Sequence, residues 1–280
     1  MKRKAHAKLN LGLNVIRKRE DGYHDLRMIM VPVDLFDTVE IVESNQLTIQ
    51  SNKYYLPNDD KNTVYKAVKV MHQRYDTPTN FQIKLVKNIP TQAGMAGGSA
   101  DAACVINMLN DMYSLNLTQD ELIEVGLKIG ADVPFCLFNK PALVTGIGEK
   151  LEFLNIDTNF HLFLVKPSFG VSTKKLFENL EIKEASVLEF EELLDGLQTG
   201  NYDKIQRNII NDLQPQAINE HPEIQKIIDE LVQFGFDNAC MTGAGSVVFG
   251  ITQDENLTRK AVEQFYLKYP LVKKSGIVTI

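Results

Sequence analysis

A glycine-rich stretch at residues 90–103, PTQAGMAGGSADAA, constrains the fold of this chain more than any other segment. Before it, residues 81–88 alternate apolar and polar side chains with the period of a half-buried strand. After it, apolar residues recur at helical spacing from Ala102 to Met112. The sequence therefore predicts a strand, a glycine-rich turn and a helix in direct succession.

Such a turn favours an anionic ligand. Gly94, Gly97 and Gly98 are expected to let the backbone adopt positive φ and approach a ligand closely. The start of the helix offers unpaired N–H groups and about half a positive charge, which suit a phosphate chain. The stretch is neither a Walker A motif nor a Gly-x-Gly-x-x-Gly motif. A plain tight connection is the alternative, since glycine marks turns in general.

Composition narrows the class of protein. The 280 residues are 44% hydrophobic and 24% charged, as in ordinary globular chains of one large or two medium domains. A net charge of −6 argues against a broad basic surface for nucleic acid. Three widely spaced cysteines form neither a zinc motif nor a disulfide framework, and no apolar run reaches membrane-spanning length. We expect a cytoplasmic protein without nucleic-acid or membrane partners, as a monomer or weak homodimer.

The first strand carries polar residues on one face. Residues 5–15 alternate, so the odd positions are expected to be buried while Lys8, Asn10 and their even-numbered neighbours share the other face. Lys8 and Asn10 would lie about 7 Å apart. A solvated polar face is one interpretation. Asn and Gly are poor strand formers, which favours a functional one.

Two further segments hold candidate residues. An Asp-Gly turn at residues 21–22 is followed by Tyr23 and His24, which could face a ligand or simply pack. Asp132 precedes Pro134 at a sharp corner, where its side chain could act chemically or cap a helix that Pro134 begins.

The second half has a different pattern. Polar residues 155–159 indicate a domain boundary, dividing the chain into residues 1–157 and 158–280. Beyond them the sequence predicts a strand, helices, a two-strand hairpin, a helix and a strand, as in an α+β sandwich of the ferredoxin-like type. A second glycine-rich turn lies at residues 242–246.

These features together resemble the GHMP kinase superfamily, and within it the 4-diphosphocytidyl-2-C-methyl-D-erythritol kinases. The motifs that carry the resemblance are AKLNL at 7–11, DGYH at 21–24, AGGS at 96–99, GADVP at 130–134, GVST at 170–173 and NDL at 211–213. The resemblance implies an α+β fold with two domains. These are an N-terminal ribosomal-protein-S5-like α/β domain and a C-terminal ferredoxin-like domain, with the site in the cleft between them.

The resemblance also implies a reaction, the phosphorylation of the 2-hydroxyl of the cytidine diphosphate-linked polyol by ATP with Mg²⁺, in non-mevalonate isoprenoid synthesis. It makes Asp132 the catalytic base, with Lys8 beside it, and assigns no residue to the metal. The implied ATP-binding residues are Pro90, Gly94, Met95, Ala96, Gly97, Gly98, Ser99 and Asp101. The implied substrate-binding residues are Asn10, Tyr23, His24, Thr173, Phe177, Gly243 and Gly245, with Tyr23 and Phe177 stacking on the cytosine.

One position departs from the family pattern. The family loop reads Gly-Gly-Ser-Ser, and here Ala100 replaces the second serine, so a methyl group stands where a hydroxyl would bind phosphate or metal. Two alternatives follow within the fold: a kinase acting on a different small-molecule alcohol, or a weakened nucleotide-binding regulator. A plain α/β binding protein is a third, but it would need neither Lys8 nor Asp132.

Overall fold

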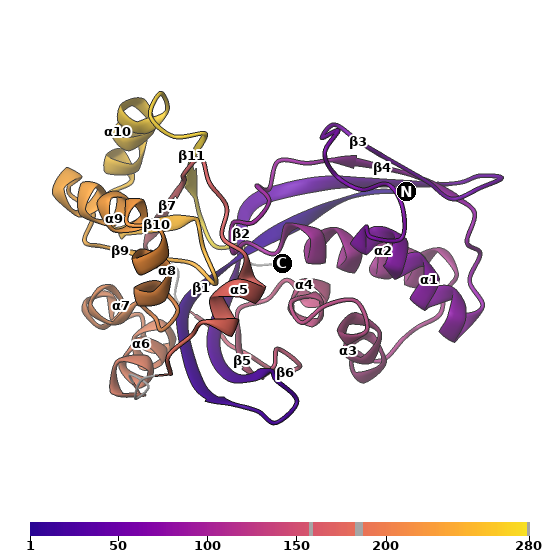
Figure 1. The fold of residues 1–280 in the computed structure, drawn as a ribbon, viewed down its shortest axis with the longest axis horizontal. Coiled ribbons are helices and arrows are strands. Elements are labelled where there is room, and N and C mark those ends of the chain that lie inside the picture. The colour runs from indigo at the N-terminus through magenta and orange to yellow at the C-terminus, as the bar shows by residue number, and fades with distance from the viewer. Residues whose placement is uncertain (157–158, 183–186, 279–280) are drawn as a thin grey trace. The chain divides into compact units, whose positions relative to one another are not determined.

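The computed structural model describes residues 1–156, 159–182 and 187–278 (Figure 1). Its contacts divide the chain into two compact units. Unit 1 holds residues 1–8, 35–90 and 96–139, and unit 2 holds residues 9–34, 91–95 and 140–280. The predicted boundary at 157–158 falls outside the described residues and stays a prediction, as does the place of the site in a cleft.

Two long strands pass through both units. They are β1 (Lys2–Lys18) and β2 (His24–Glu43), joined by a turn in which Gly22 has φ +85°, as the Asp-Gly signal predicts. The sheet to which they belong has the order β3-β4-β2-β1-β8, and β5 pairs with β2 and with β6.

Unit 1 adds two strands and four helices to these long strands. The strands are β3 (Thr48–Ser51) and β4 (Phe81–Val86), which pair in parallel, and β4 runs antiparallel to β2. The helices are α1 (Thr63–Tyr75), α2 (Gly97–Met112), α3 (Gln119–Leu127) and α4 (Val133–Phe138). They lie along one face of these strands (Figure 1). The predicted strand, glycine-rich turn and helix are thus confirmed as β4, residues 87–96 and α2.

Unit 2 contains the ferredoxin-like part of the chain. Its four strands are β7 (His161–Lys166), β9 (Asn238–Met241), β10 (Val248–Thr252) and β11 (Leu271–Ser275), in the order β11-β7-β10-β9 and antiparallel throughout. With α9 (Glu223–Phe234) and α10 (Glu255–Phe265), they realise the predicted succession of strands and helices. The last strand was expected at residues 276–280. β11 ends at Ser275, Ile277 forms only an isolated bridge with Val33, and residues 279–280 lie outside the described residues.

Unit 2 also contains three further strands and four further helices among the described residues. They are β5 (Ala142–Gly146), β6 (Lys150–Phe153), β8 (Ile210–Asn211), α5 (Thr173–Glu178), α6 (Val187–Thr199), α7 (Tyr202–Asn208) and α8 (Gln214–Glu220). In the described part of the chain, no helix is long and apolar enough to cross a membrane.

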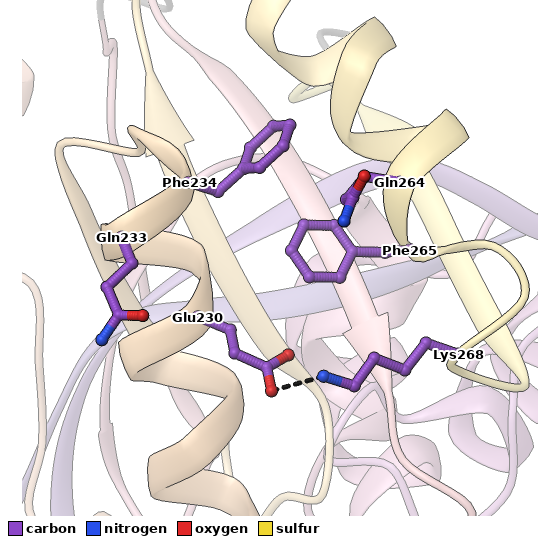
Figure 2. Close-up of a pocket in the computed structure, with 6 residues that line it drawn as sticks. All are labelled: Glu230, Gln233, Phe234, Gln264, Phe265 and Lys268. Atoms are coloured by element: carbon purple, nitrogen blue, oxygen red, sulfur yellow. Dashed lines mark hydrogen bonds and ion pairs between the residues drawn. The ribbon is translucent and has the colours of Figure 1, made fainter.

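A surface hollow of about 330 Å³ lies between α9 and α10 (Figure 2). Phe234 and Phe265 form its apolar wall, and Glu230 and Lys268 pair across its edge. The six described residues that line it include none of the predicted site residues.

The polar face of β1 is buried, contrary to the interpretation of a solvated face. Residues 5–15 are buried on both faces of the strand, so Lys8, Asn10 and Asn14 lie inside the protein. Burying an amide or an ammonium group costs free energy unless it is bonded. The burial therefore favours the functional interpretation of Lys8 and Asn10.

Candidate active site

The first part of the glycine-rich stretch packs against the late glycine-rich turn of the same unit. The backbone N–H of Val247 donates to the carbonyl of Ala93 at 3.3 Å. Gly94 has φ +72°, and a Cβ placed on it would lie 2.1 Å from the carbonyl oxygen of Thr242. Only glycine fits this contact, so the two glycine-rich segments, 148 positions apart at Gly94 and Thr242, adjoin each other.

The contact between Gly94 and Thr242 predicts that Gly94→Ala destabilises the protein more than Gly22→Ala, which serves as the reference. Gly22→Ala should cost about 1–2 kcal/mol, because Gly22 has φ +85° with open space around it. Gly94→Ala should cost more, since it adds a backbone clash to the same strain. Urea denaturation of both variants measures the difference. Equal losses would mean that the Gly94–Thr242 contact is not tight in solution.

The second part of the stretch forms the start of α2 in unit 1. Ala96 is the residue before the helix, with φ +57°, and no side chain caps this end. Gly97 and Gly98 are helical, so the expectation that they have positive φ is wrong. Gly97 is required for close packing instead, because a Cβ there would lie 2.9 Å from Cγ2 of Ile89. The N–H groups of the first turn have no acceptor within the helix.

Lys8 and Asp132 meet in unit 1. Nζ of Lys8 lies 3.9 Å from Oδ1 of Asp132. The Lys8 side chain is 5% exposed and that of Asp132 is 40% exposed, so the cation is buried while the carboxylate is open to a ligand. Asp132 stands before α4 but makes no side-chain capping bond. The alternative that Asp132 merely caps a helix is therefore wrong.

The late glycine-rich turn in unit 2 is held by buried amide and hydroxyl groups. The Nδ2 group of Asn211 donates to the carbonyls of Met241 and Gly243, at 2.6 and 2.8 Å. The backbone N–H of Asn10 donates to the Thr242 hydroxyl at 2.8 Å. Asn10 thus contacts the turn that contains Gly243 and Gly245, and the role of these three residues in substrate binding stays a prediction.

The predicted cytosine residues lie in unit 2. The rings of His24 and Phe177 have centroids 5.0 Å apart with an interplanar angle of 35°, and Tyr23 is 59% exposed. Thr173 opens α5, which carries Phe177, and Ser172 caps that helix. Burial, aided by the nearby charge of Lys18, lowers the pKa of His24, which favours the neutral form of its ring.

Two of the predicted ATP-binding residues have buried side chains. Met95 is 1% exposed, and Asp101 is 2% exposed and forms an ion pair with Lys87. Sequence reasoning did not single out Lys87 or its second partner, Asp37. A charged residue directly between a strand and a glycine-rich turn is the signal that could have drawn attention to Lys87.

Comparison with known proteins decides the family. Residues 62–140 match the model for the GHMP kinases N terminal domain, and residues 193–271 match the GHMP kinases C terminal model. A 4-diphosphocytidyl-2-C-methyl-D-erythritol kinase of Clostridium botulinum is 40% identical, over 95% of this chain and 96% of that protein. The chain belongs to this kinase family. Its relative of the same name in Clostridium perfringens is 39% identical, over 96% and 94% of the two chains.

Solved structures agree with this kinase family. The crystal structure of a 4-(cytidine 5′-diphospho)-2C-methyl-D-erythritol kinase is 28% identical and has a TM-score of 0.81, covering 99% of both chains. A homoserine kinase from Cytophaga hutchinsonii, 17% identical with a TM-score of 0.76 over 98% and 94% of the chains, shares the fold. The predicted α+β GHMP kinase fold is confirmed, and the chain is an ATP-dependent small-molecule kinase.

Proposed function

We propose that this kinase transfers the γ-phosphoryl group of ATP to the 2-hydroxyl of 4-diphosphocytidyl-2-C-methyl-D-erythritol, in non-mevalonate isoprenoid synthesis. The names of its relatives support this acceptor. The structural observation that supports it best is the Lys8–Asp132 pair, whose carboxylate is exposed and has no capping role.

Asp132 would act as the general base. An alcohol is a poor nucleophile at neutral pH, and a carboxylate that accepts its proton accelerates attack by about 10²- to 10⁴-fold. The buried ammonium of Lys8, 3.9 Å away, would place a positive charge beside the developing alkoxide. Phosphoryl transfer needs positioning and charge neutralisation more than covalent catalysis. Asp132 as base and Lys8 as cation would supply what the reacting hydroxyl of the acceptor needs.

The start of α2 would bind the ATP phosphates through its free N–H groups. Mg²⁺ is usually held by one or two protein groups together with phosphate oxygens, and when bound it neutralises charge on them. In the described ranges, no group of three or more His, Cys, Asp or Glu residues could hold a metal. The half-buried residue Ser99, in the first turn of α2, would be the protein group that holds the ion.

The acceptor would bind through the residues of unit 2. Tyr23 and Phe177 would stack on the cytosine. The ring of His24, which in its neutral form has one donor and one acceptor nitrogen, would bond to the polar edge of the base. Asn10 and Thr173 would orient the polyol and diphosphate, and Gly243 and Gly245 would line that side. The three cysteines are free and buried, which suits a cytoplasmic enzyme.

A panel of acceptors tests the function. ATP consumption should be fastest with 4-diphosphocytidyl-2-C-methyl-D-erythritol, and the product should gain one phosphoryl group by mass spectrometry. Homoserine and mevalonate serve as acceptors of other GHMP kinases. If kcat/KM is higher with homoserine or mevalonate than with 4-diphosphocytidyl-2-C-methyl-D-erythritol, the proposed acceptor is wrong.

Ala100 favours a second candidate, a nucleotide-binding regulator with little turnover. Ala100 is buried in the first turn of α2, and Ala96 offers a carbonyl one turn earlier. A serine hydroxyl at position 100 would donate its hydrogen bond either to the Ala96 carbonyl or to a ligand. Single-turnover phosphotransfer from ATP distinguishes an enzyme from a regulator.

Ala100→Ser should therefore lower the KM for ATP by about 2- to 12-fold, the effect of one ordinary hydrogen bond. Steady-state kinetics with varied ATP at saturating acceptor measures the change. An unchanged KM and kcat would mean that the missing hydroxyl is not a ligand in this chain.

A further inference from the structure

Two side chains hold successive carbonyl groups of the glycine-rich loop in unit 1. Nζ of Lys87 donates to the carbonyl of Gly97 at 3.3 Å, and the hydroxyl of Thr63 donates to the carbonyl of Gly98 at 2.7 Å. In a planar trans peptide, the C=O group and the following N–H group point in opposite directions. The N–H groups of Gly98 and Ser99 therefore point away from Lys87 and Thr63.

Lys87 is itself held by two buried carboxylates. Its Nζ donates to Oδ2 of Asp101 at 2.5 Å and also to Oδ2 of Asp37. All three side chains are nearly inaccessible, at 4% exposed for Lys87, 0% for Asp37 and 3% for Asp101. The Lys87 ammonium thus has one position, and that position includes the contact with Gly97.

The same network fixes the backbone that leads into the loop. The second oxygen of Asp37 accepts from the N–H groups of Asn88 and Ile89, at 2.5 and 2.8 Å. The side chain of Asn52 bonds to both the N–H and the carbonyl of Lys87. Lys87 is therefore anchored through its main chain and its side chain.

Three buried charges are costly unless they are paired. Burial works against the charge of Lys87, but the carboxylates of Asp101 and Asp37 outweigh it and raise the Lys87 pKa. Burial raises the pKa of Asp101 to about 7, against the opposing effect of Lys87. The fold retains this costly cluster directly under the start of α2, where rigid backbone geometry would matter for a phosphate ligand.

We propose that Lys87, held by Asp37 and Asp101, and Thr63 are positioning residues that direct the Gly98 and Ser99 N–H groups toward the phosphates of a nucleotide. The proposal rests on the proposed function in so far as the loop binds ATP. It assigns Asp101 to the support of the loop through Lys87, in place of the direct ATP contact expected from sequence.

The test uses Mg²⁺–ADP and titration calorimetry with the full chain. Thr63→Val removes the hydroxyl and keeps the shape, so the Kd for ADP should rise by about 2- to 12-fold, the effect of one hydrogen bond. Thr63→Ser restores the donor and should bind within about 2-fold of the wild type on the same scale. A purely structural role would lower the melting temperature of Thr63→Val without changing the Kd.

A second variant tests the ion cluster. Lys87→Met alone would leave two buried carboxylates together, so it is combined with Asp101→Asn. Lys84→Met, on the exposed face of β4, serves as the control. The double variant should weaken ADP binding at least as much as Thr63→Val, with the control unchanged. If the double variant does not fold, Thr63→Val and Thr63→Ser decide.

The outcomes separate this proposal from the proposed function. An unchanged Kd in Thr63→Val, or equal losses in the Val and Ser variants, would overturn the positioning role. A wild type that binds ADP but does not phosphorylate the acceptor would overturn the function and leave the positioning role standing. A wild type that binds no ADP would overturn both.

Discussion

We expect Asp132→Asn to lower kcat by about 100-fold or more, because under the proposed role of Asp132 the amide could not accept the proton of the acceptor hydroxyl. The variant keeps the size of the side chain, and Asp132 makes no capping bond that could be lost. The melting temperature should therefore stay close to that of the wild type. Steady-state kinetics at saturating ATP and acceptor, together with a thermal melt, measures both quantities.

A matched control makes the same chemical change at another helix start. Asp254 caps α10 by accepting from the N–H of Asn256, and asparagine caps helices about as well as aspartate. Asp254→Asn should leave kcat unchanged. Full activity of Asp132→Asn would show that this carboxylate is not the base. The burial of Lys8 beside Asp132 would then need another explanation.

We expect Phe177→Ala to raise the KM for the cytidine-bearing acceptor by about 5- to 150-fold, because stacking of a base on an aromatic ring contributes about 1–3 kcal/mol. The KM for ATP should not change. Methylerythritol phosphate, which lacks the base, should be insensitive to the substitution. Acceptor kinetics with both compounds measures the difference, and Tyr23→Ala should behave like Phe177→Ala.

Phe177→Leu separates stacking from packing. Phe177 contacts the ring of His24, so a structural role is the competing explanation. Leucine keeps the apolar bulk that packs on His24 but offers no flat face to a base. If leucine restores the acceptor KM, or if both acceptors lose equally in Phe177→Ala, then the ring is structural and the cytosine assignment falls.

Local sequence signals determined much of the fold. The alternation of residues 81–88, the glycine-rich turn and the helical spacing after it predicted β4 and α2, because each signal concerns neighbours along the chain. The Asp-Gly turn at residues 21–22 was confirmed for the same reason. The set of short motifs also indicated the kinase family to which the chain belongs.

Only the tertiary structure decided which polar groups are buried and paired. Alternation in β1 could not show that Lys8 lies inside the protein, 3.9 Å from Asp132 and 124 positions away in sequence. The helical spacing in α2 likewise could not show whether Asp101 contacts a phosphate or pairs with Lys87. The physical reason is that the cost of burying a charge, and the partner that offsets it, depend on segments brought together by folding and not on local periodicity.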